Sequence, residues 1–226
     1  MTRMTADNRL DLDKTFADTY FVLRWALVVI AVVLPPFLVI GRAVITRKFE
    51  LLPSLSDYYC SNMRDWFVGL LFAAAAGLYI YKGLSDKEDK LLNAAAVFAA
   101  GTAVNPVWWQ PPWWSLPVKP HYVFAVLFFV TIALVCWLCQ DDSLNLKLIP
   151  PVSIRRYRAK YVMIGLALVF FPVLAVVLSY VDTSSPKSPV FWAEAAAIWV
   201  FAYYWYTKSG ELKMAIDRGR VGRGKL

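Results

Sequence analysis

Histidine and cysteine are scarce in this sequence, which holds one histidine and three cysteines among 226 residues. A tetrahedral zinc site takes four ligands, most often histidine and cysteine side chains, so the chain has few residues from which to build one. An odd number of scattered cysteines also gives no disulfide framework. We therefore expect no metal, no cofactor and no disulfide-stapled fold.

Charged residues are also fewer than usual. They make up 18% of the chain and hydrophobic residues 59%, against about 25% and 45–50% in an ordinary soluble domain. The apolar residues form long runs rather than alternating or heptad patterns. This distribution excludes intrinsic disorder and most soluble fold classes.

Six apolar runs are long enough to be transmembrane helices, because a helix needs roughly 20 residues to cross a bilayer core of about 30 Å. They cover residues 20–40, 66–81, 91–109, 122–139, 161–181 and 190–206. We therefore predict an all-α polytopic membrane protein, built as a bundle of six transmembrane helices.

Lysine and arginine residues are unequally divided between the two sides of such a bundle. With the N-terminus inside, 18 of the 24 fall on the cytoplasmic side, which predicts that both termini are cytoplasmic. The chain then divides into a cytoplasmic segment (1–19), a transmembrane domain (20–206) and a basic cytoplasmic tail (207–226). We expect the tail to meet anionic lipid headgroups rather than nucleic acid, in an integral protein of a bacterial inner membrane.

Small residues recur every fourth position in the second run, at Gly69, Ala73 and Gly77. Such a stripe lets another helix backbone approach closely. We therefore predict that it is a helix–helix contact, and that Ala73 has no room for a larger side chain.

Glu194 is the most conspicuous charge within a predicted span, because it lies about one turn inside the sixth run. Ionisable residues at such positions are costly and are functional candidates. A structural interpretation is an ion pair or hydrogen bond with Arg64 or another group at the same membrane depth. A functional interpretation is that Glu194 binds a ligand or a proton.

The predicted outer loop between the first two runs is dense in polar side chains, and the single histidine, His121, lies on the same side just before the fourth run. Asp57, Arg64, Asp65, His121 and Glu194 are expected to converge in one outer pocket. The candidate ligand-binding residues are Ser54, Ser56, Asp57, Tyr58, Arg64, Asp65, His121 and Glu194.

The central part of the chain, residues 52–137, resembles a group of uncharacterised bacterial six-span membrane proteins that is distantly similar to the DRAM and Frag-type family. The resemblance rests on S-x-S-x-Y-Y, M-R-D-W-F-V-G, L-L-N-A-A-A-V-F-A-A-G-T-A-V-N-P and H-Y-V-F-A-V-L-F-F. It implies a six-span fold, and a signature formed by Ser54, Ser56, Tyr58, Arg64, Gly69 and His121. It implies no particular reaction, and the Trp-rich loop before His121 has no match in it.

Three functions remain open on these observations. The first is a membrane protein that binds a lipid or small ligand at the outer pocket, or that serves as the membrane subunit of a partner or of a homo-oligomer. The second is an intramembrane lipid hydrolase or acyl-transfer enzyme, in which Ser54 or Ser56 would be the nucleophile, His121 the base and Asp57 the group orienting it. The third is a transporter or channel that uses Glu194 as its intramembrane carboxylate.

Overall fold

The computed structural model describes residues 6–109, 111–112, 115, 118–144, 151–181 and 189–223. Throughout these ranges the chain is helical, with turns and loops but no strand, so the predicted all-α class is confirmed. The elements are α1 (Ala6–Thr46), η1 (Ser56–Cys60), α2 (Arg64–Ile80), α3 (Asp86–Val104), α4 (Pro120–Leu138), α5 (Gln140–Leu144), α6 (Pro151–Val181) and α7 (Pro189–Arg223).

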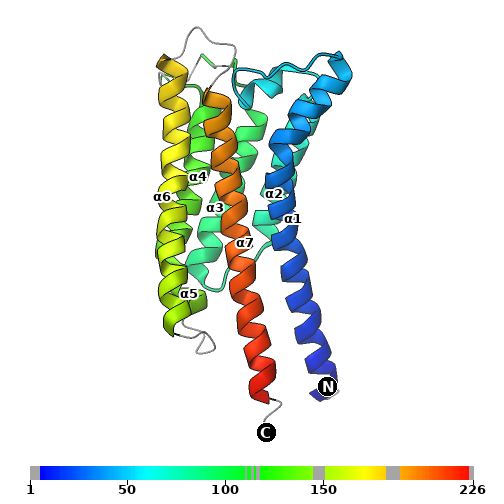
Figure 1. The fold of residues 1–226 in the computed structure, drawn as a ribbon, viewed down its shortest axis with the longest axis vertical. Helices are drawn as coiled ribbons and strands as arrows, with labels where there is room; N and C mark the ends of the chain where they lie inside the picture. The colour runs from blue at the N-terminus through cyan, green and yellow to red at the C-terminus, as the bar shows by residue number, and fades with distance from the viewer. Residues whose placement is uncertain are drawn as a thin grey trace.

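Six long helices form a closed ring. α2, α3, α4, α6 and α7 each contact the long helix that precedes them in the chain, and α7 returns to contact α1. The start of α1 and the end of α7 lie at the same end of the bundle and extend below the other helices in Figure 1. We call this the inner end, and the opposite end, where η1 lies, the outer end.

Three of the described helical segments are long and apolar enough to cross a membrane: Asp18–Thr46, Pro120–Leu138 and Ser153–Val181. In each of them no more than 33% of the most apolar window is buried. Large apolar side chains such as those of Val29, Met163 and Phe170 therefore point outward. An apolar exterior on helices of this length is typical of a protein embedded in lipid.

The other predicted runs also lie in long helices, although their ends shift. The third run was expected to continue to Trp109, but α3 ends at Val104. Pro106 explains the difference, because proline disfavours the α conformation in the residue before it and Asn105 is extended. At the other end of α3, the Ser85 hydroxyl accepts a hydrogen bond from the Glu88 N–H and caps the helix.

The predicted small-residue contact on α2 is wrong for two of its three positions. A Cβ added at Gly69 would meet nothing within 4 Å, and Ala73 is exposed. Gly77 alone is buried, against Leu27 of α1. The buried face of α2 is displaced by one residue along the helix and includes Ala74, because the ring turns that face towards α1 and α3.

Glycine does mediate a close helix contact between α4 and α6. A Cβ built on Gly165 would clash with the indole ring of Trp137. The bulky side chain of one helix thus occupies the space that a side chain at position 165 would need. This contact helps to close the wall of the ring.

Candidate functional site

An apolar cavity of about 110 Å³ lies inside the ring, lined by side chains from all six long helices and from the segment that opens η1. Most of its lining is aliphatic or aromatic, including Leu34, Phe67 and Phe201. Polar side chains are few, and Ser56, His121 and Glu194 are among them. We call these three residues the outer polar trio.

Glu194 reaches across from α7 to the first residue of η1. Its two carboxylate oxygens accept hydrogen bonds from Ser56: Oε2 from the backbone N–H at 3.0 Å and Oε1 from the hydroxyl Oγ at 3.1 Å. A buried carboxylate needs such donors, because no water replaces them. The two bonds also hold η1 against the outer part of α7.

His121, one residue into α4, is fully buried, with 0% of its surface exposed. Its Nδ1 lies 2.8 Å from the backbone carbonyl oxygen of Asn105, and its Nε2 lies 3.2 Å from the Ser56 Oγ. A carbonyl oxygen can only accept, so Nδ1 must carry a proton. The ring is thereby fixed with Nε2 facing the serine hydroxyl.

The turn that presents Ser56 is stabilised by its own side chains. The Ser54 N–H donates to Asp57 Oδ2, and the Asp57 N–H donates to Ser54 Oγ, each at 3.0 Å. Tyr58 is buried beside Phe191, with ring centroids 6.3 Å apart. Burial raises the pKa of the Tyr58 hydroxyl, although the Leu52 backbone and the Arg42 charge oppose the rise. These contacts stabilise the turn that positions Ser56. The side chains of Ser54, Asp57 and Tyr58 therefore support the site indirectly.

Arg64 and Asp65 lie outside the trio. The Arg64 guanidinium sits 4.9 Å from the ring centroid of Tyr59 and donates to its hydroxyl at 3.4 Å. Asp65 is exposed in the first turn of α2. Among the described contacts Glu194 is held by Ser56, which agrees with the structural interpretation of a hydrogen bond to a group at the same membrane depth, although that group is Ser56 rather than Arg64. α2 begins on the outer rim, and its first side chains point away from the ring interior.

Asp57 does not orient the histidine as the hydrolase hypothesis required. Its carboxylate is bound within the turn by Ser54, whereas the His121 Nδ1 is held by the Asn105 carbonyl. The sequence could not identify this partner, because any residue can supply a backbone carbonyl.

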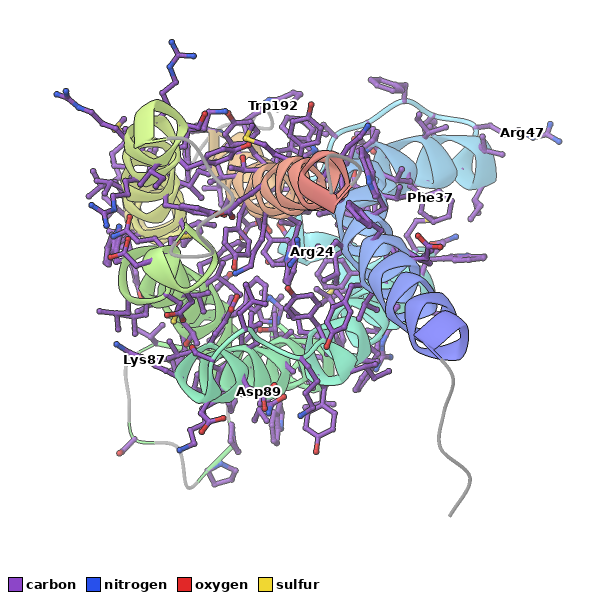
Figure 2. The ribbon with its side chains drawn as sticks, turned by 90° about the horizontal axis from the view of Figure 1, so that it is seen from below. Arg24, Phe37, Arg47, Lys87, Asp89 and Trp192 are labelled. Atoms are coloured by element: carbon purple, nitrogen blue, oxygen red, sulfur yellow. The ribbon has the colours of Figure 1, made fainter. Side chains whose placement is uncertain are left out.

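A second polar cluster lies at the inner end of the bundle. We call it the inner ionic cluster, and it consists of Arg24, Tyr81, Glu88, Tyr161, Lys208 and Glu211. The Lys208 ammonium pairs with Glu88, and these side chains are only 3% and 0% exposed. Arg24 donates to the Tyr81 hydroxyl and, at 2.6 Å, to the Lys208 carbonyl oxygen. Figure 2 shows Arg24 inside the ring, whereas Lys87 and Trp192 lie at its edge.

This cluster ties together α1, α3, α6 and α7, together with Tyr81 at the end of α2. The Tyr161 hydroxyl donates to Glu211 Oε2 at 2.6 Å, and the Leu84 N–H donates to Glu88 Oε2 at 2.9 Å. Arg24 and Lys208 are among the 18 basic residues that the sequence places on the cytoplasmic side, and that assignment does not predict their burial in a cluster. One signal was available, because Arg24 falls inside the first apolar run, where a charge needs a partner.

Within the described residues, no group of three or more histidine, cysteine, aspartate or glutamate side chains is arranged to hold a metal ion. Comparison of the chain with protein-family models, with curated proteins and with solved structures gave no match. The cavity and the two polar clusters are therefore the features that indicate a function.

Proposed function

We propose that this chain is an integral membrane protein that binds a lipid or a similar amphiphile, with an apolar segment in the cavity and a polar group at the outer polar trio. In this proposal all six long helices span the membrane, with the inner end and both termini in the cytoplasm. The positive-charge bias supports this orientation. A bacterial inner membrane, anionic lipids around the basic tail and the likeness to the DRAM and Frag-type family belong to the same proposal.

The single observation that carries the proposal is an apolar cavity that ends at hydrogen-bonding groups. Ligand sites are typically lined by apolar side chains, with a few placed polar groups that fix the orientation of the ligand. Cavities of about this size with apolar walls stay dry and accept small apolar molecules. A cavity of 110 Å³ would take a short stretch of an acyl chain or one small ring.

Photocrosslinking tests this proposal. A phospholipid carrying a photoreactive group on its acyl chain, added to the protein in nanodiscs, should label residues that line the cavity. Ala74→Phe should reduce this labelling several-fold, because Ala74 lines the cavity. The matched control is Ala73→Phe, one residue along the same helix and on its exposed face. Equal labelling in both variants would reject binding inside the ring.

A second function, an acyl-transfer or hydrolase activity, is favoured by one specific contact. The Ser56 Oγ lies 3.2 Å from the His121 Nε2, which is within reach of a general base. In such a reaction Oγ would attack the carbonyl carbon of an ester, Nε2 would take the hydroxyl proton, and the leaving alcohol would then receive it. Water would release the acyl group in the second step.

A fluorophosphonate probe distinguishes this enzyme from a binding protein. If Ser56 is a nucleophile, the probe should label the wild-type chain and not Ser56→Ala or His121→Ala. Ser179→Ala is the control, because Ser179 also lines the cavity but donates to the Val176 carbonyl instead. Lack of labelling at Ser56 would remove the enzyme and leave the lipid-binding proposal standing.

A further inference from the structure

The outer polar trio poses a problem in counting protons. The Ser56 hydroxyl has one proton, yet its oxygen contacts Glu194 Oε1 at 3.1 Å and His121 Nε2 at 3.2 Å. An ionised carboxylate only accepts hydrogen bonds. A neutral histidine whose Nδ1 carries the proton has only a lone pair at Nε2. Two acceptors would then face one hydroxyl proton.

The Asn105 carbonyl makes this conflict unavoidable for a neutral ring. Because it lies 2.8 Å from the His121 Nδ1, it keeps the single proton of the neutral imidazole on that nitrogen. Both contacts of the Ser56 hydroxyl are satisfied only if one more proton is present. That proton resides either on Glu194, which then donates to Oγ, or on Nε2, which then does so.

We propose that Glu194, Ser56 and His121 form a proton-binding site at the outer end of the cavity. The two protonated forms interconvert without any change in the total number of protons. As Glu194 gives its proton to Oγ, the Oγ proton passes to Nε2, and the charges become carboxylate and imidazolium. The serine hydroxyl is the relay between the two ionisable groups.

Burial disfavours the charged forms of both His121 and Glu194, so the surroundings favour the form with the proton on Glu194. Asp57 on η1 contributes a negative charge close to both His121 and Glu194. Among the described residues, Tyr122 on α4 also interacts with Glu194, and Tyr180 on α6 and Cys60 on η1 lie close to Tyr122 in turn. Two arginines at the outer ends of neighbouring helices have other partners: Arg42 of α1 bonds Glu50, and Arg64 of α2 covers Tyr59. Neither arginine neutralises Glu194.

Loss of the proton should loosen the outer end. When Glu194 is ionised and His121 is neutral, Ser56 can keep its two hydrogen bonds to Glu194. Its hydroxyl then has no second proton to donate to the His121 Nε2. This hydrogen bond between α4 and η1 would then be lost. The inference goes beyond the proposed function, because the proton count follows from the three contacts whether or not a lipid occupies the cavity.

His121 is the only histidine in the chain, so it can be observed alone. We would label the protein with ¹⁵N-histidine, purify it through a tag without histidine, and record the ring nitrogens by NMR in nanodiscs at neutral pH. Infrared spectra of the same samples report whether a protonated carboxylic acid is present. We expect either a protonated Nε2 or a carboxylic-acid band that disappears in Glu194→Gln. A bare Nε2 together with no such band would overturn the inference.

Removing the bridge provides the second test. In wild type we expect the trio to titrate as one unit, whereas in Ser56→Ala the His121 titration midpoint should shift by about one pH unit, the equivalent of one lost hydrogen bond. Ser179→Ala should leave it unchanged. An unchanged midpoint in a folded Ser56→Ala protein would contradict the relay, and the wild-type spectra decide the matter if this variant does not fold. Lipid photocrosslinking is measured separately, so either proposal can fail alone.

Discussion

The Glu88–Lys208 pair allows a quantitative prediction about what holds the inner end together. Both side chains are almost completely buried, and Glu88 also accepts the Leu84 N–H at 2.9 Å. Removing one partner of a buried ion pair leaves an uncompensated charge and typically lowers stability by about 3–5 kcal/mol. Glu88→Gln should therefore lower the free energy of unfolding by roughly 3 kcal/mol or more, a change of over a hundredfold in the folding equilibrium.

An exposed ion pair that also uses α3 provides the control. Lys82 pairs with Asp89 at 3.2 Å, but the Lys82 side chain is 63% exposed. Exposed pairs of this kind contribute at most about 1 kcal/mol. Lys82→Met should therefore change stability little, although it removes the same type of charge pair from the same helix.

A double variant distinguishes the loss of the Glu88–Lys208 attraction from the cost of leaving one buried charge without a partner. Glu88→Gln combined with Lys208→Met removes both charges, so it should be less destabilising than Glu88→Gln alone. The assay is unfolding by sodium dodecyl sulfate in mixed micelles, followed by circular dichroism. If Glu88→Gln unfolds at the same detergent fraction as Lys82→Met, the pair does not stabilise the fold and our reasoning about it fails.

Three further predictions concern packing, hydrogen bonding and orientation. Gly165→Ala should destabilise by about 1–3 kcal/mol because its methyl group meets a tryptophan ring, whereas Gly69→Ala, in open space, should be neutral or slightly stabilising; equal melting temperatures would contradict the close contact. Tyr81→Phe should lower stability by about 1–3 kcal/mol, because Arg24 loses a buried acceptor; an unchanged melting temperature would show that the bond contributes nothing. In intact cells an impermeant maleimide should label native Cys60, which is exposed at the outer end, but not Lys87→Cys in a Cys60→Ser background; the reverse pattern would invert the proposed topology.

The helical fold follows from the sequence because apolar runs of roughly 20 residues have few alternatives to a helix. The six runs all overlap long helices, but their ends differ. α1, α6 and α7 extend well beyond their runs, whereas α3 stops short at Val104 because Pro106 disfavours the α conformation in the residue before it. Which face of each helix is buried was harder to predict. Gly69 and Ala73 have the spacing of a contact but lie on the outside, because neighbours in the ring decide which face is buried.

The outer polar trio could be predicted in part, because the sequence indicates at which membrane depth each residue lies. Ser56, His121 and Glu194 were among the candidates because all three lie near the same predicted boundary, and the structure brings them into contact. Depth alone says nothing about direction around a helix, so it also included Arg64, whose guanidinium packs on Tyr59. The inner ionic cluster was missed for a related reason, since counting Lys208 as a solvated cytoplasmic charge conceals its pairing with Glu88, 120 residues away.

Closure of the ring by its last helix has a consequence for biosynthesis. α7 supplies Glu194 to Ser56 at one end and Lys208 to Glu88 at the other, yet it is translated after the other five long helices of the ring. Until it arrives, the nascent chain carries Arg24 and Glu88 without these partners among the helices already made. Chains stopped before α7 are therefore expected to be recognised by membrane quality-control proteases, because the ring can close only once α7 has been made.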